Sequence, residues 1–402
     1  MPSLDPVARA AQMLERGDLS SAERMVSNLV PRPDALHLLA QVRTRQNRFE
    51  EALPLLEHSL AARPGHAGVL FDLGRVLSHL RRDGEAVHAL EDSLLWEPQR
   101  AEAWYELGEV QHRRGDFTAA ETSFRSLLAL QPGHLLGKLA LGLTLKEAGR
   151  SAEAESLFAE GLAQSGEALL KAGFAYNLAL VQSDQGRHAA ALASFSLVSR
   201  FDPGRGVGDL GRAGILEEMG RTDEAALLLE ALLRREPMNA AAHEAYNNLL
   251  HRHGRDEEFL KSYDRAPAAG VLQTGKANFL LKTGRREEAH ALYAAIAARE
   301  PDNLNAILGA AGALNQLGRQ DEAAAELEQA LARHPDSIPL YRQLAATALE
   351  ARDPQRAAVM AQKVLTLAPL DQYGLALQGT AWRMLDDERD EILNHYDELI
   401  AV

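Results

Sequence analysis

The sequence predicts an all-α fold: a right-handed α-solenoid of about 11–12 helix–turn–helix repeats. Two residue types recur at a spacing of 34 residues. The alanines of this series are Ala52, Ala86, Ala120 and Ala154, and the glycines are Gly74, Gly108 and Gly142. Hydrophobic residues make up 46% of the chain but aromatic ones only 5%. The core must therefore be built largely from alanine and leucine, which favours helices.

One unit, residues 103–132, shows what each recurring position does. Trp104 lies on the buried face of the first helix, and Gly108 lacks a Cβ, so the second helix can approach closely. Gly115 ends the first helix in a left-handed turn, and Asp116 is placed to cap the second helix. Pro132 stops that helix. Two such helices cannot bury their apolar faces alone, so each unit needs neighbours.

This unit resembles a tetratricopeptide repeat. The resemblance is carried by Trp104-x-x-Leu107-Gly108, Ala120-x-x-x-Phe124 and Pro132, with Gln111 where the repeat pattern has tyrosine. It implies an array whose first helices line a concave groove.

The chain departs from the regular repeat in a few places. The unit that begins near 135 has no closing proline, and about three extra residues follow it. Gly254 and Gly284 are 30 residues apart instead of 34, and Phe259 occupies the place of a small alanine. These features predict a degenerate capping repeat at 1–33, a regular array at 34–237 with an insertion near 164–171 and a glycine-rich turn at 204–211, an aberrant repeat at 238–269, a regular array at 270–371 and a capping helix pair at 372–402.

The glycine-rich turn contains Gly206-x-Gly208-x-x-Gly211, which formally matches a dinucleotide-binding pattern. That pattern binds phosphate only after a strand in a βαβ unit. A helix that ends at Phe201–Pro203 is expected here instead, so the glycines predict an inter-repeat turn.

Nothing in the sequence predicts catalysis, a metal or a cofactor. The absence of cysteine excludes a thiolate metal site and a cysteine nucleophile. The histidines lack the short paired spacings of metal ligands. His395-x-Asp397 resembles part of a two-histidine, one-carboxylate iron site, but no second histidine on a β scaffold accompanies it. The carboxylates at 386–391 are typical of a solvated helix face. We expect a non-enzymatic chain.

The net charge of −14 argues against a nucleic-acid or anionic-membrane surface and favours cationic or neutral partners. No apolar run reaches the length of a membrane span, and the N-terminus carries charges where a secretory signal has an apolar segment. We therefore expect a cytoplasmic protein that binds a protein or peptide. Self-association through the terminal repeats stays open.

The groove candidates are first-helix residues that face away from the core positions. Mixed aromatic and polar side chains suit an extended peptide, because aromatic rings supply contact area and asparagines bond backbone amides. The alternative is an ordinary exposed surface of a spacer. The basic and amide clamp that chaperone-binding relatives use for a C-terminal carboxylate is missing. The predicted groove residues are Phe71, Arg75, Tyr105, Glu109, His112, Lys146, Tyr176, Ser183, Glu244, Asn248, His251 and Asn278.

The C-terminal third has a narrower resemblance, to the repeat region of bacterial proteins in which a long array precedes a 2-oxoglutarate/Fe(II) oxygenase domain. It is carried by Phe259-Leu-x-Ser262-Tyr263-Asp264, Gly379-x-x-Trp382-Arg383 and Asn394-x-Tyr396-Asp397. The resemblance implies a module that recruits partners for an oxygenase, although no oxygenase catalytic residue has a counterpart in these 402 residues. A free-standing adaptor and the array of a fused sulfotransferase or glycosyltransferase are the alternatives.

Overall fold

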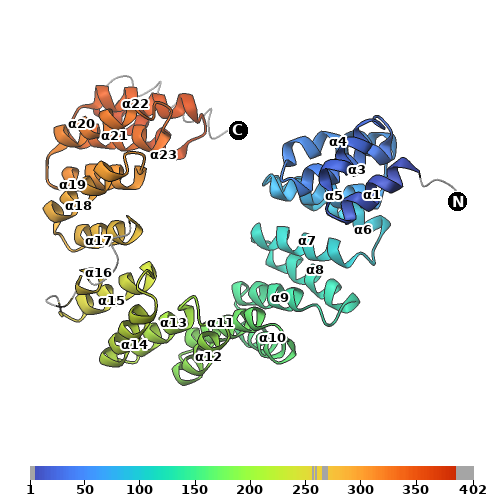
Figure 1. Ribbon diagram of the computed structural model, residues 1–402, viewed down its shortest axis with the longest axis horizontal. Coiled ribbons are helices and arrows are strands. Elements are labelled where there is room, and N and C mark those ends of the chain that lie inside the picture. Colours follow the sequence, from blue (N-terminus) through green and yellow to red (C-terminus); the bar gives the residue numbers. More distant parts are fainter. Residues whose placement is uncertain (1–4, 256–257, 259, 265–269, 386–402) are drawn as a thin grey trace. The chain divides into compact units, whose positions relative to one another are not determined.

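The computed structural model describes residues 5–255, 258, 260–264 and 270–385, and these residues form helices, turns and loops without a strand (Figure 1). The chain forms two compact units, Met1–Ile215 and Leu216–Val402. In each unit, consecutive helices pack as pairs and each pair packs on the next. The described residues therefore have the predicted all-α, paired-helix architecture.

The first unit consists of six complete helix pairs and the start of a further helix. These helices are α1 (Pro6–Glu15), α2 (Leu19–Ser27), α3 (Pro33–Arg45), α4 (Phe49–Ala62), α5 (Ala67–His79), α6 (Asp83–Trp96), α7 (Ala101–Arg113), α8 (Phe117–Leu130), α9 (Leu135–Glu147), α10 (Ser151–Gln164), α11 (Ala168–Asp184), α12 (His188–Phe201) and α13 (Val207–Glu218), which continues into the second unit.

The second unit repeats the arrangement with one much shorter helix, α16. Its helices are α14 (Thr222–Arg235), α15 (Ala240–Arg252), α16 (Lys261–Asp264), α17 (Gly270–Lys282), α18 (Arg286–Arg299), α19 (Leu304–Gln316), α20 (Gln320–Leu331), α21 (Ile338–Glu350), α22 (Pro354–Leu367) and α23 (Gln372–Leu385). Phe259 lies outside the described residues.

The periodic small residues form the contacts between paired helices. Ala120 and Ala154 are fully buried. A Cβ added to Gly108 would lie 2.6 Å from the Phe124 ring, so the predicted close approach of the second helix is confirmed. These positions decide how near α8 and α10 come to the first helices of their pairs.

The turns follow the predicted pattern with one difference. Gly115 has a φ of +81°, the left-handed conformation that ends α7. Asp116 occupies the N-cap position of α8, but its side chain makes no capping hydrogen bond. Its carboxylate lies 3.3 Å from the Arg114 guanidinium instead. The predicted N-cap position of Asp116 is therefore confirmed, but its carboxylate pairs with Arg114 and not with the N–H groups of the helix terminus.

The predicted glycine-rich turn at 204–211 is a turn only as far as Gly206, because α13 contains Gly208 and Gly211, which make close packing contacts. A helix, α12, precedes it, as expected, and α13 begins at Val207. A Cβ on Gly208 would lie 2.6 Å from the Phe195 carbonyl oxygen, and one on Gly211 would lie 2.3 Å from the Phe195 ring. These glycines therefore allow α13 to pack directly on α12.

A buried asparagine holds α16 against α15. Asn247 donates from Nδ2 to the His243 carbonyl oxygen at 2.7 Å and to Ser262 Oγ at 2.8 Å. Its Oδ1 accepts a hydrogen bond from the Leu260 backbone N–H. His243 Nδ1 also lies 3.0 Å from Ser262 Oγ. This polar network stands where the second helix of the pair has only four residues.

Candidate functional site

All twelve predicted groove residues lie on the first helices of their pairs. These helices are α5, α7, α9 and α11 in the first unit, and α15 and α17 in the second. None of the twelve is fully buried. First helices of neighbouring pairs contact one another within each unit, as α5 does with α7 and α15 with α17. We call the exposed side of these helices the first-helix face.

Three of the predicted residues come together in the second unit. Glu244, Asn248 and Asn278 line a depression of about 610 Å³ between α15, α17 and the turn that precedes α19. We call this depression the asparagine recess. Sequence reasoning missed other residues that line the recess, which come from α16, from other positions of α17, from the turn before α19 and from the start of α19: Tyr263, Thr274, Lys282, Glu300, Asn303 and Asn305.

The two recess asparagines stand at the same point of successive repeats, six residues before the turn glycines Gly254 and Gly284. Asn248 Oδ1 accepts a hydrogen bond from Lys282 Nζ at 2.8 Å. Asn278 Oδ1 accepts one from the Tyr293 hydroxyl. Since both amide oxygens are engaged, each side chain keeps its NH₂ group as a donor.

The recess also contains hydrogen-bond acceptors. Glu244 is exposed, and its carboxylate can only accept when ionised. Glu300 accepts a hydrogen bond from Asn303 Nδ2 at 2.8 Å and retains further acceptor capacity. The recess thus presents donors and acceptors side by side, as a peptide backbone does.

The first-helix face of the first unit includes two tyrosines that pack on buried phenylalanines. Tyr105 packs edge-on against Phe124, with ring centroids 6.1 Å apart. Tyr176 packs in the same way against Phe195, at 5.9 Å. Both tyrosines are half-buried, so they are parts of the core as well as of the surface.

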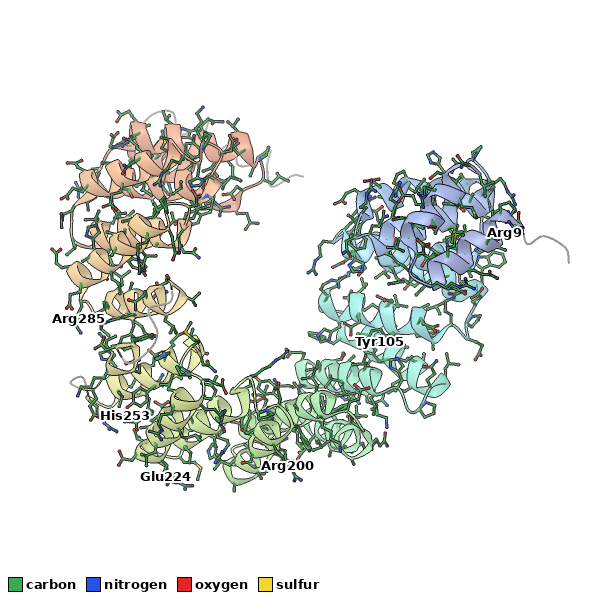
Figure 2. All side chains as sticks on the ribbon, in the orientation of Figure 1. Arg9, Tyr105, Arg200, Glu224, His253 and Arg285 are labelled. Atoms are coloured by element: carbon green, nitrogen blue, oxygen red, sulfur yellow. The ribbon has the colours of Figure 1, made fainter. Side chains whose placement is uncertain are left out.

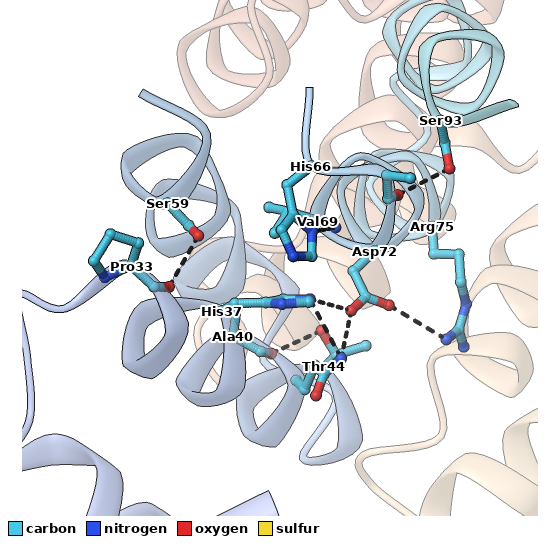
Figure 3. A network of polar contacts seen from close by, with 12 residues as sticks. Pro33, His37, Ala40, Thr44, Ser59, His66, Val69, Asp72, Arg75 and Ser93 are labelled. Atoms are coloured by element: carbon cyan, nitrogen blue, oxygen red, sulfur yellow. Dashed lines mark hydrogen bonds and ion pairs between the residues drawn. The ribbon is translucent and has the colours of Figure 1, made fainter. Parts of the chain in front are cut away.

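One predicted residue, Arg75, belongs to a network of polar contacts that joins neighbouring first helices (Figure 3). Asp72 accepts from Gln41 Nε2 at 2.7 Å and lies 2.8 Å from His37 Nε2. Arg75 lies 3.4 Å from the Glu106 carboxylate. The sequence signal that was overlooked is the 34-residue spacing of Asp72 and Glu106, which directly follow Phe71 and Tyr105.

The remaining predicted residues are less concentrated. His112 Nδ1 lies 3.0 Å from Thr144 Oγ1, and Lys146 lies 4.0 Å from the Asp184 carboxylate. The exposed His251 packs edge-on against Phe279 at 6.1 Å. Ser183 is half-buried on α11. His112, Lys146 and His251 therefore contact residues of adjacent first helices and do not form a cluster with one another.

Glu109 is the distinctive charge of this face. It has no hydrogen bond or ion pair with a described residue. Burial raises the pKa of the Glu109 carboxyl above its ordinary value, the charge of Glu106 raises it further, and Arg113 opposes both effects. Burial together with Glu109 and Glu106 raises the pKa of Tyr105 to about 12. The Glu109 carboxylate is thus partly removed from water without a cation bound to it.

We expect Glu109→Gln to stabilise the folded chain at pH 7 by about 0.5 kcal/mol. A raised pKa in the folded state means that folding penalises the ionised carboxylate. That penalty is fully present above the folded pKa and disappears at about pH 3, well below the ordinary pKa of a glutamate, where the carboxyl is protonated both folded and unfolded. Urea unfolding followed by circular dichroism at the two pH values measures the difference. An equal gain at both pH values would contradict the electrostatic explanation.

The described residues contain no group of three or more His, Cys, Asp or Glu placed to hold a metal ion. Within the same residues, no helix is long and apolar enough to span a membrane. His395, Asp397 and the carboxylates at 386–391 lie outside the described residues.

Helix pairs that pack one on the next define an α-solenoid. Residues 43–109 and 280–347 match the tetratricopeptide repeat family. Residues 82–250 match the middle TPR-like domain of cilia and flagella-associated protein 70. The chain therefore contains tetratricopeptide repeats. No curated protein sequence matches it.

Solved structures with a similar fold include MamA, with 19% identity over 39% of this chain and 93% of that one, at a TM-score of 0.37. PilF of Pseudomonas aeruginosa is similar with 17% identity over 55% of this chain and 97% of that one, at a TM-score of 0.43. YrrB, described as a TPR protein with an unusual peptide-binding site, has 20% identity over 43% of this chain and 88% of that one, at a TM-score of 0.40. Identities of this size establish no shared function.

Proposed function

We propose that this chain is a protein-interaction scaffold that binds an extended segment of a partner protein on its first-helix face. The observation that carries the proposal is the pair Asn248 and Asn278 in the asparagine recess. Their oxygens are held by Lys282 and Tyr293, and their NH₂ groups remain to donate. Tetratricopeptide repeats in both units support the same class of function.

The chemistry of the recess suits an extended main chain. Carbonyl groups on one side of an extended peptide recur every second residue, about 6.6–7 Å apart. Donors on two adjacent first helices can therefore bond carbonyl oxygens of one segment. The Glu244 carboxylate can accept from a peptide N–H group. Bonds to the main chain supply affinity with little dependence on the partner's sequence.

We expect the double variant Asn248→Ala/Asn278→Ala to weaken peptide binding by about tenfold. Each lost hydrogen bond is worth about 0.5–1.5 kcal/mol, and 1.4 kcal/mol corresponds to a factor of ten in Kd. Peptides selected from a random display library on the full chain provide the probe, and fluorescence anisotropy gives Kd. The matched control is Asn28→Ala, which removes an exposed asparagine that follows α2.

Two outcomes would contradict the proposal. If the library yields no binding peptide, the exposed first helices serve as a spacer. If peptides bind and the double variant keeps their Kd, binding takes place elsewhere on the chain. Unchanged thermal melting of the variant shows that its fold is intact.

A narrower version of the proposal is that the array recruits a substrate or partner for an oxygenase domain. It rests on the sequence resemblance alone. Tyr263 lies in α16 and Trp382 in α23, whereas Phe259 and residues 394–397 lie outside the described residues. The reading frame beyond Val402 is the test. A β-rich continuation with His-x-Asp and a later histidine would support this version. An α/β sulfotransferase or glycosyltransferase domain would support the fused alternative, and a stop codon would support the free-standing adaptor.

We also propose that the protein acts in the cytoplasm without catalytic activity of its own. Cell fractionation with an antibody against the chain tests the location. Light scattering on the purified chain tests self-association through the terminal repeats, which remains a prediction.

A further inference from the structure

The first unit has a second feature suited to a partner, on α7. Tyr105, labelled in Figure 2, is held edge-on against Phe124, and its ring centroid lies 5.5 Å from that of His134. Glu109 follows four residues later, so it lies one turn along the same face of the helix. An aromatic ring fixed by its neighbours and a carboxylate therefore stand next to each other.

The charges around Glu109 are already committed to other partners. Arg113 is one turn further along α7, but its guanidinium binds both Asp83 oxygens, at 2.6 and 3.0 Å. Arg75 lies against Glu106 at 3.4 Å. Among the described residues, no cation is thus left in contact with Glu109. A partly desolvated carboxylate without a cation in direct contact is unfavourable, and a ligand cation would relieve that cost.

In the preceding repeat, the aromatic ring at the equivalent position contacts cations that the chain itself supplies. Phe71 and Arg75 occupy the places that Tyr105 and Glu109 occupy 34 residues later. There the Arg75 guanidinium lies 5.6 Å from the centre of the Phe71 ring, and that of Arg100 lies 5.2 Å from it. On α7, Glu109 stands in the place of Arg75. The Tyr105 ring therefore has no equivalent cation from its own helix.

We propose that Tyr105 and Glu109 bind a lysine or arginine side chain of the partner segment. Its charge would lie against the Glu109 carboxylate and the face of the Tyr105 ring. Its methylene groups would contact Leu139 and Leu143, which are half-buried and pack in the same core cluster as Tyr105. The net charge of −14 favours the approach of such a segment. This inference rests on the proposed function, because the basic residue belongs to the bound peptide.

The test uses four degenerate peptide libraries that share one length and differ in a single fixed central residue: lysine, arginine, glutamate or norleucine. Capture of each library by the immobilised full chain is measured at low salt. We expect the lysine and arginine libraries to be captured about fivefold to tenfold better than the norleucine library. Norleucine keeps the methylene stem of lysine without its charge, so this ratio isolates the charge.

Two substitutions on α7 locate the effect. Glu109→Gln is expected to reduce the ratio to about one, and Glu109→Lys to make the glutamate library the preferred one. Glu102→Gln is the matched control, because Glu102 is an exposed glutamate on the same helix. It should leave the preference for basic residues unchanged, which shows that one fewer negative charge on α7 is not the cause.

Failure of this inference can be told apart from failure of the proposed function. Asn248→Ala/Asn278→Ala should lower capture of all four libraries by a similar factor, whereas Glu109→Gln should lower only the basic ones. If no library is captured, the proposed function itself is wrong. If all are captured equally, or if Glu109→Gln keeps the basic preference, only the assignment of Tyr105 and Glu109 is overturned.

Discussion

Gly142→Ala is expected to destabilise the folded chain by about 1–2 kcal/mol, even though alanine is the better helix former. A Cβ at this position would lie 2.4 Å from the Phe158 ring, which is fully buried on α10. Overpacking of this kind costs about 1–3 kcal/mol, and the gain in helix propensity offsets up to about 1 kcal/mol of it. Urea unfolding followed by circular dichroism measures the change.

A second substitution tests whether the close contact is the cause. Ala311 and Leu327 stand 16 residues apart in one core cluster of the second unit, as Gly142 and Phe158 do in the first. We therefore expect Gly142→Ala/Phe158→Leu to be more stable than Gly142→Ala alone. Additive effects of the two substitutions would contradict the explanation. Gly173→Ala is the control: it lies in α11 with nothing within 4 Å of an added Cβ, so this change should not destabilise the chain.

Asn247→Ala is expected to lower the free energy of local unfolding by about 2–4 kcal/mol, and only in the segment around α16. The side chain is fully buried and bonds the Leu260 N–H, Ser262 Oγ and the His243 carbonyl oxygen. Each buried group left without its partner costs about 1–3 kcal/mol, and part of this cost is relieved where water enters. Native-state hydrogen exchange of the Leu260 and Tyr263 amides measures the loss.

The adjacent residue provides the comparison for this variant. Asn248 is half-buried and lines the asparagine recess. Asn248→Ala should therefore weaken peptide binding and leave exchange at Leu260 unchanged, whereas Asn247→Ala should accelerate exchange there. If the two variants behave alike, the distinction between a structural and a binding asparagine on α15 is wrong.

The fold could be predicted from the sequence because it depends on local and periodic features. The 34-residue spacing of Ala120 and Ala154 identified residues that are fully buried. Gly108 identified a close approach, since only the absence of a Cβ admits the Phe124 ring there. Each repeat contacts mainly its neighbours, so these rules need no long-range information.

The details of the candidate site could be predicted only in part. The sequence identified Glu244, Asn248 and Asn278 as polar residues on the exposed side of first helices. The hydrogen bonds that orient the two asparagine amides come from Lys282 and Tyr293 on other helices. Asp116 shows the same limit, because the direction of its carboxylate depends on a competing guanidinium. Side-chain pairing across helices depends on rotamers, which periodicity does not determine.

Hydrogen exchange of the full chain, with and without a library-selected peptide, tests the central claim most directly. The claim predicts that the peptide slows exchange in the first helices α15 and α17 and leaves the second helices α14 and α18 unchanged. Slower exchange confined to α14 and α18, in the presence of a peptide that binds, would contradict it.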